Sequence, residues 1–200
     1  MRNSNSELTR KKIIKTALKL FVQKGYHGTP IANIAKATKL TKGAIYFHFT
    51  SKHEILKGIL EEYDRTFLGS MIKEVGSSEG KAIDKIRTYL KFSINFAAKN
   101  EDLIMAHANL ATELCSSNKK YEKEIKKIYE KYYKFLADLL EEGKGDGSLR
   151  EDINPSILAI NLIGGNEGNL VQWSFNKNKG QAKQFSRSFM KFFLNGICKH

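Results

Sequence analysis

Two short runs of sequence set the architecture of this 200-residue chain: Gly25-Tyr26-His27-Gly28-Thr29-Pro30-Ile31-Ala32-Asn33-Ile34-Ala35 and Leu40-Thr41-Lys42-Gly43-Ala44-Ile45-Tyr46-Phe47-His48-Phe49. The first predicts a short helix from Pro30 to about residue 37, because Thr29 is a good N-cap and proline is tolerated in the first helical position. The second predicts a helix from Lys42 to about Phe49, capped by Thr41. Two short helices joined by a tight turn, ahead of a longer helix, indicate a helix-turn-helix.

The second of these helices has the composition of a recognition helix. Ile45 and Phe49 are four residues apart and are expected to face the core. The outer side is then formed by Thr41, Lys42, Ala44, Tyr46 and His48. Gly43 and Ala44 are small, so the backbone can approach DNA closely. Small and polar side chains of this kind contact base edges, while flanking groups hold phosphates.

The two runs, continued by Ser51-Lys52-His53-Glu54-Ile55-Leu56, resemble the N-terminal domain of TetR-family transcriptional regulators. The resemblance covers about residues 8–60 and implies that the partner is double-stranded DNA. It implies base-edge neighbours at Thr41, Lys42, Gly43 and Ala44, phosphate contacts at Tyr46 and Lys52, either role for His48, and a backbone contact at Thr29. In one departure, Lys39 stands where the family usually has the turn glycine. We expect a left-handed Lys39 or a different turn, and its ammonium can add a phosphate contact.

Beyond residue 51 the pattern stays helical. Apolar residues recur at three- and four-residue spacing over about 52–75, 81–99, 102–114, 119–142, 155–173 and 182–197, with glycine-rich breaks at 76–80 and 143–147. The sequence has no strand pattern and no repeat. We therefore expect an all-α fold of about nine helices. Residues 1–51 are expected to form the helix-turn-helix domain, and residues 52–200 a larger helical domain for ligand binding and dimerisation.

The charge is concentrated in the first third of the chain. The whole sequence has a formal net charge of +13, from 34 Lys and Arg against 21 Asp and Glu. Residues 1–60 hold twelve basic and two acidic residues, a net charge of +10, and the other 140 residues have a net charge of only +3. A polyanion such as nucleic acid is therefore expected to bind the segment that contains the helix-turn-helix.

Several classes of protein are excluded by composition. No apolar run approaches the ~18–20 residues of a membrane span, and the polar residues 1–10 are not those of a secretory signal, so we expect a cytoplasmic protein without a membrane partner. Cys115 and Cys198 are expected to be free thiols. No metal site or cofactor is indicated, and Gly164-Gly165-Asn166-Glu167-Gly168 lacks the lysine of a phosphate-binding loop, so it is expected to be a close helix contact.

Polar residues inside the apolar helices of the larger domain suggest a site for a small molecule. Such residues are more often satisfied core groups, but polar groups between aromatic walls are what a pocket requires. The candidate ligand-binding residues are Phe92, Asn95, Phe96, Met105, His107, Tyr132, Leu136, Asn166 and Trp173. The family resemblance implies an effector there, and we expect a lipophilic one.

The last two helices are expected to form a dimer. Residues 156–173 and 182–197 have more apolar surface than one subunit can bury, notably at Phe185, Phe189, Phe192, Phe193 and Ile197. The family resemblance implies a four-helix bundle between two copies, and a two-fold dimer suits a palindromic operator.

We therefore predict a homodimeric transcriptional regulator, most simply a repressor that releases its operator when the effector binds. A transcriptional activator and a non-specific DNA- or membrane-surface protein are the alternatives. A small enzyme would need a clustered reactive group, and the sequence offers no such cluster, so we do not expect an enzyme.

Overall fold

The computed structural model describes residues 2–115, 119–175 and 179–198. Within these residues it contains ten α-helices, one π-helical segment and, in place of strands, a single isolated bridge between Leu149 and Cys198. The expected all-α fold is confirmed. None of the described helices has the length and apolarity needed to cross a bilayer. Cys198 is a free thiol, as expected, and the side chain of Cys115 lies outside the described part.

The described chain forms two compact units. Unit 1 comprises Met1–Thr66 and Glu101–Lys126, and unit 2 comprises Phe67–Asn100 and Lys127–His200. Each unit is thus built from two separate segments of the chain: residues 67–100 of unit 2 lie in sequence between the two segments of unit 1. The predicted division into a DNA-binding domain (residues 1–51) and a ligand-binding and dimerisation domain (residues 52–200) is functional, and it stays a prediction.

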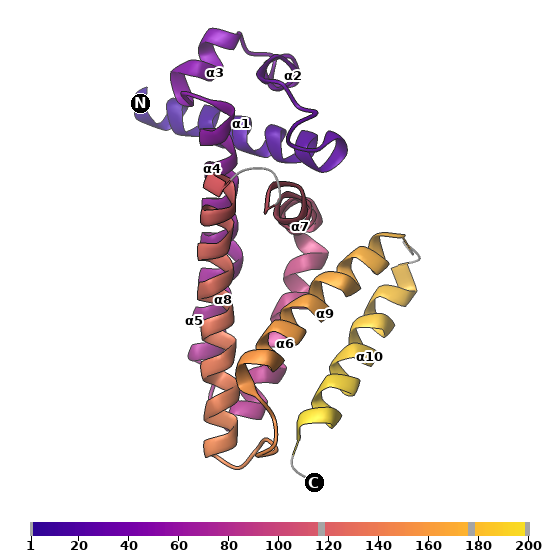
Figure 1. Cartoon of the computed structure of the whole chain (residues 1–200). Helices are drawn as coiled ribbons and strands as arrows, with labels where there is room; N and C mark the ends of the chain where they lie inside the picture. The colour runs from indigo at the N-terminus through magenta and orange to yellow at the C-terminus, as the bar shows by residue number, and fades with distance from the viewer. Residues whose placement is uncertain (1, 116–118, 176–178, 199–200) are drawn as a thin grey trace. The chain divides into compact units, whose positions relative to one another are not determined.

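Unit 1 contains the helix-turn-helix. Its helices are α1 (Arg2–Lys24), α2 (Ile31–Thr38), α3 (Lys42–His48), α4 (Lys52–Tyr63), α7 (Glu101–Cys115) and the start of α8 (Lys119–Gly145). The short helices α2 and α3 lie together against α1, and α4 follows α3 (Figure 1). The core between them is apolar and includes Ile13, Phe21, Ile34, Ile45, Phe49 and Ile55. Helix α7 also packs against α1, so a helix from far along the sequence completes this unit.

The long helix predicted over residues 52–75 is divided in the structure. A π-helical segment, Asp64–Leu68, separates α4 from α5 (Gly69–Gly76). A π-turn adds one residue to a helical turn and so changes which side chains face inward. Here Tyr63, Phe67 and Leu68 are all buried. This division accounts for ten α-helices where about nine are expected.

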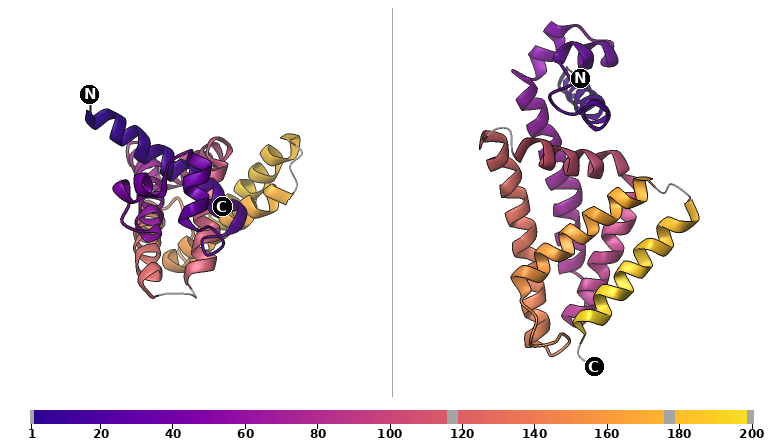
Figure 2. Two further views of the ribbon diagram at one scale, coloured as in Figure 1. Left: turned by 90° about the horizontal axis from the view of Figure 1, so that it is seen from above. Right: turned by 45° about the vertical axis from the view of Figure 1, so that its right-hand side comes forward.

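Unit 2 contains α5, α6 (Ala82–Lys99), most of α8, α9 (Pro155–Phe175) and α10 (Lys179–Ile197). Helix α6 packs against α5 and α10, and α9 and α10 run antiparallel side by side (Figure 2). The predicted close contact in the glycine-rich run is confirmed at Gly165. A Cβ there would lie 2.8 Å from the ring of Phe189, so any larger residue would force the ring to move away from α9.

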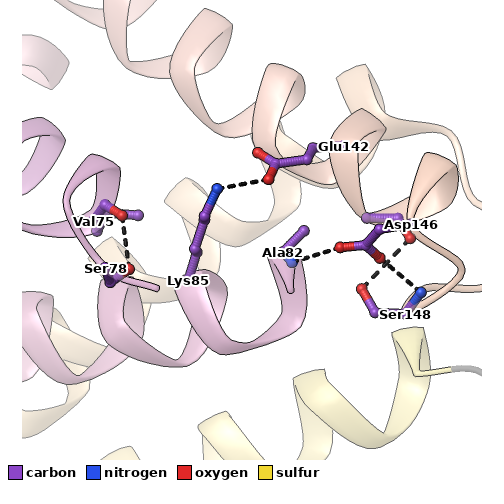
Figure 3. A network of polar contacts seen from close by, with 8 residues as sticks. Val75, Ser78, Ala82, Lys85, Glu142, Asp146 and Ser148 are labelled. Carbon is purple, nitrogen blue, oxygen red and sulfur yellow. Dashed lines mark hydrogen bonds and ion pairs between the residues drawn. The ribbon is translucent and has the colours of Figure 1, made fainter. Parts of the chain in front are cut away.

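Asp146, in the glycine-rich segment 143–147, forms a hydrogen bond to the start of α6, which follows the other glycine-rich segment, 76–80. Its carboxylate accepts a hydrogen bond from the N–H of Ala82 (2.7 Å), at the start of α6, and one from the N–H of Ser148 (2.8 Å). Lys85 and Glu142 form an ion pair (2.6 Å) beside it (Figure 3). Burial alone would raise the pKa of Asp146, but these hydrogen bonds outweigh it and lower the pKa. The carboxylate therefore caps a helix distant in sequence.

Candidate nucleic-acid interface and effector region

The turn between α2 and α3 is closed by a left-handed lysine. Lys39 has φ 56° and ψ 38°, which confirms the first of the two conformations expected for it. The N–H of Leu40 bonds the carbonyl of Ala35 (3.0 Å), and the N–H of Lys39 bonds that of Lys36 (3.2 Å). These two bonds form a Schellman motif, in which glycine usually takes this position. A left-handed lysine costs about 1 kcal/mol, and its side chain is exposed.

Helix α3 presents most of the predicted DNA contacts to solvent. The Oγ1 of Thr41 accepts a hydrogen bond from the N–H of Ala44 (3.1 Å), which confirms the predicted cap. Ile45 and Phe49 are buried, as expected. Thr41, Lys42, Gly43 and Tyr46 are exposed residues, and Ala44 and His48 are half-buried.

Thr29 lies inside unit 1 and offers no surface to DNA. Its exposed fraction is 0%, and its hydroxyl donates to the carbonyls of Gly25 (2.8 Å) and Leu20 (3.3 Å). The predicted cap is wrong, because Pro30 is the N-cap residue of α2 and no side chain bonds there. The hydroxyl of Thr29 satisfies the end of α1 instead.

Lys52 is held by the loop that follows α1. Its Nζ donates to the carbonyl of Tyr26 (2.8 Å) and lies 4.2 Å from the centre of the Tyr26 ring. Burial lowers the pKa of Lys52, and the charge of Glu113 partly offsets this. An ammonium has three N–H donors, so the bond to Tyr26 leaves others for a phosphate. The contact thus orients Lys52.

Two residues outside the predicted set support this surface, Glu113 and Arg10. Glu113 on α7 accepts hydrogen bonds from the N–H groups of Tyr26 (2.8 Å) and His27 (2.9 Å). Arg10 on α1 donates to the carbonyl of His48 (3.2 Å), and its guanidinium lies 4.3 Å from the ring centre of Phe49. Neither residue has a local sequence signal, because each contact joins segments that are distant along the chain.

The predicted ligand-binding residues fall into both units. In unit 1, Met105 is half-buried and His107 is buried. The ring of His107 stacks on that of Tyr63, with centroids 3.7 Å apart and an interplanar angle of 6°. This stacking makes His107 part of the core of unit 1.

The burial of His107 predicts a pH-dependent stability. Burial lowers the pKa of His107 from the ordinary histidine value of 6.5 to about 3. Between these values the unfolded chain binds a proton that the folded chain does not, so stability is lost as pH falls below 6.5. We expect a loss of about 2 kcal/mol between pH 7 and pH 5, measured by urea unfolding. His107→Phe should flatten this dependence, and an unchanged slope in that variant would contradict the assignment.

In unit 2 the structure brings four of the predicted residues together. The ring of Phe67 contacts those of Phe92, Phe96 and Tyr132, with centroids 5.9, 5.1 and 5.7 Å away. The hydroxyl of Tyr132 bonds that of Tyr89 (2.8 Å), which accepts a bond from the Nδ2 of Asn166 (2.7 Å). We call these six residues the aromatic cluster. Burial raises the pKa of Tyr89 to about 12, so its hydroxyl stays neutral.

The remaining candidates are outside this cluster. Asn95 is exposed, because it lies on a different face of α6 from the buried Ser93 and Ala97. Leu136 is buried and Trp173 is half-buried. Next to Asn166, the carboxylate of Glu167 accepts a hydrogen bond from the hydroxyl of Tyr129 (2.7 Å), and burial raises the pKa of Glu167.

Two family models match the chain over nearly its whole length. The model described as bacterial regulatory proteins of the tetR family matches residues 13–59, and that of the C-terminal region of YsiA-like proteins matches residues 54–196. The fatty acid metabolism regulator protein of Bacillus subtilis (strain 168) is 26% identical over 189 residues, which are 92% of this chain and 93% of that protein.

Solved structures have the same fold. The MbdR regulator from Azoarcus sp. CIB superposes with a TM-score of 0.85 at 25% identity, over 96% of this chain and 100% of that one. FadR from Bacillus subtilis in complex with stearoyl-CoA superposes with a TM-score of 0.79 at 24% identity, over 94% and 98%, which shows a shared fold. With its helix-turn-helix in the segment that the first family model matches, the chain belongs to the TetR family of bacterial transcriptional regulators.

Proposed function

We propose that this protein is a homodimeric repressor that binds a pseudo-palindromic operator and releases it when a small lipophilic molecule binds. Residues 1–51 contact the DNA, and residues 52–200 dimerise and bind the effector. The effector must bind the two conformers of the dimer with different affinity, because only then does it change operator affinity.

The observation that best supports DNA binding is the exposed face of α3. Lys42, Gly43 and Tyr46 are exposed on a helix whose other side is anchored in the core by Ile45 and Phe49. The first 60 residues have a net charge of +10, which favours a polyanion. A basic and exposed helix that is anchored in the core in this way suits the major groove.

Exposed apolar side chains of α9 and α10 support dimerisation. Ile157 and Ile160 on α9 and Phe192 on α10 are exposed, whereas Phe193 and Ile197 are buried and Phe189 is half-buried. Phe185 lies outside the described side chains. Large exposed apolar groups on neighbouring helices indicate an interface, and a two-fold dimer would place two α3 helices about 34–36 Å apart, or a multiple of this.

The aromatic cluster of unit 2 supports an effector with a long apolar part. It combines three phenylalanine rings and a hydrogen-bonded tyrosine pair with one amide, which is the balance of a ligand site. One relative is named as a regulator of fatty acid metabolism, and one solved structure of this fold holds stearoyl-CoA. A long-chain acyl thioester is therefore the first effector to test.

Selection of bound fragments from a genomic library tests the operator. The purified protein is expected to enrich a palindrome and to prefer it by a factor of about 10³ or more over random DNA. Fragments bound without an enriched sequence would contradict the proposal. Stearoyl-CoA is then added to the selected complex, with coenzyme A as control. We expect release with the acyl thioester alone, and release by neither compound would exclude this effector class.

Tyr46→Ala is expected to weaken operator binding about tenfold, and equally for all sequences, because Tyr46 is predicted to hold a phosphate. The side chain is 51% exposed, so the fold should be unaffected. Binding titrations on the selected operator and on random DNA measure the effect, and thermal unfolding checks the fold. Tyr46→Phe keeps the ring and removes the hydroxyl, so it separates the contributions of these two groups to operator affinity. If both variants bind like the original protein, Tyr46 does not belong to the interface.

A further inference from the structure

Phe47 projects from α3 on the side opposite to the core. It lies two residues after Ile45, and at 3.6 residues per turn this is about 200° around the helix axis. Ile45 is buried, and the exposed fraction of Phe47 is 80%. The centre of the outward face of α3 is therefore a phenyl ring, whose nearest ring neighbour is His48 at 5.2 Å, edge to face.

Gly43 shares this face one turn earlier. A Cβ added at Gly43 would have one neighbour within 4 Å, the Oγ1 of Thr41 at 3.9 Å. The space over Gly43, one turn from Phe47, is therefore open, and no side chain covers the backbone of α3 there. Tyr46, on the adjacent side, is also exposed. The outward face thus has an apolar ring, a gap next to it and a hydroxyl at its edge.

This ring has no role in the packing of unit 1. Burial of a phenylalanine side chain is worth about 1.5–3 kcal/mol, yet the fold leaves Phe47 in water while it buries Phe49 two residues later. The neighbourhood is basic, with Lys36, Lys39 and Lys42 all exposed. A polyanion that presents an apolar group to α3 would match both the exposed ring of Phe47 and its basic surroundings. In the major groove that group is the C5-methyl of thymine.

We propose that Phe47 reads the C5-methyl group of a thymine in each half-site of the operator, with Gly43 providing the space for the base edge. The inference rests on the proposed function, because it needs α3 to lie in the major groove. It makes Phe47 a residue that determines sequence specificity, whereas Tyr46, Lys39 and Lys52 are expected to contact phosphates.

A double-mutant cycle between protein and DNA tests this contact. Deoxyuridine replaces each thymine of the selected operator in turn, symmetrically in both half-sites, which removes only the methyl group. At one position we expect the original protein to lose affinity about tenfold, since each of two methyl contacts is worth about threefold to fourfold. Phe47→Ala should bind the thymine operator more weakly and show no further loss with deoxyuridine.

Leu8→Ala is the matched control, because Leu8 is another exposed apolar residue of unit 1 (65%) but lies on α1. The Leu8→Ala variant should lose affinity on deoxyuridine substitution as much as the original protein does. Gly43→Ala should retain its melting temperature and bind the operator more weakly, since its methyl group would occupy the gap. Unchanged operator affinity in this variant would show that no base edge lies close to Gly43.

The outcomes separate this inference from the proposed function. If an operator is selected but every deoxyuridine substitution acts equally on the original protein and on Phe47→Ala, the thymine contact is overturned and the function stands. If no operator sequence is enriched, both are overturned. A coupling confined to one thymine position supports both.

Discussion

Alanine at position 28 is expected to destabilise the protein by about 3 kcal/mol. A Cβ at Gly28 would lie 2.2 Å from the backbone oxygen of Lys24, the last residue of α1. Rotation of a side chain cannot relieve a clash with a backbone atom. The loop between α1 and α2 would have to move.

The surroundings of this loop resist such a movement. Glu113 accepts hydrogen bonds from the N–H groups of Tyr26 and His27, and Lys52 donates to the carbonyl of Tyr26. The hydroxyl of Thr29 donates to the carbonyl of Gly25. A shift of the loop therefore breaks three partly buried polar contacts, those of Tyr26 with Glu113 and Lys52 and that of Thr29 with Gly25, and each group that stays unsatisfied costs about 1–3 kcal/mol.

Thermal unfolding measures this effect. For a chain of this size 1 kcal/mol corresponds to about 2–4 °C, so we expect the melting temperature of Gly28→Ala to fall by about 6–12 °C. Gly43→Ala in the same unit is the control, because its new methyl group would clash with no atom and would only touch the Oγ1 of Thr41, 3.9 Å away. Equal melting temperatures for the two variants would show that the contacts of Glu113, Lys52 and Thr29 do not fix the loop between α1 and α2.

Alanine at position 143 is expected to cost about 2 kcal/mol. A Cβ there would lie 2.5 Å from the Cδ1 and 2.6 Å from the Cγ of Leu149, and 3.2 Å from the Cβ of Ala82. Leu149 is fully buried, and its own N–H bonds the carbonyl of Gly143 (2.9 Å). The leucine can neither rotate into solvent nor withdraw without loss of this bond, and this outweighs the higher helix propensity of alanine, about 1 kcal/mol.

Gly145→Ala provides a closely matched comparison. It lies two residues further along α8, and a Cβ there meets no atom within 4 Å. Its melting temperature should stay the same or rise. Leu149→Ala combined with Gly143→Ala should lose less stability than the sum of the single changes, because the smaller side chain removes the clash. Strict additivity would argue against the contact between these two residues.

The local features of the fold were predictable because their causes lie within a few residues. Thr41 and Ser51 cap α3 and α4 through bonds to N–H groups three residues later. Lys39 takes the left-handed conformation that the turn requires. The outward position of Phe47 also follows from its spacing to Ile45, two residues earlier, although it was not among the predicted contacts.

The roles of other residues depended on segments far away in the sequence. Thr29 is a plausible cap by position, but the carbonyls at the end of α1 take its hydroxyl. Asn95 lies in an apolar helix, yet it is exposed. The helical period sets which residues share a face, and only packing decides which face is covered.

The sequence by itself determined the all-α class, the helix-turn-helix and the family, since periodicity, caps and turn residues act over three or four positions. The tertiary structure alone decided that Glu113 holds the loop at Tyr26 and His27, and that Lys52 is oriented by Tyr26. These contacts span up to 87 positions. The physical reason is that a carboxylate or ammonium has no preferred partner until packing brings one within hydrogen-bonding distance.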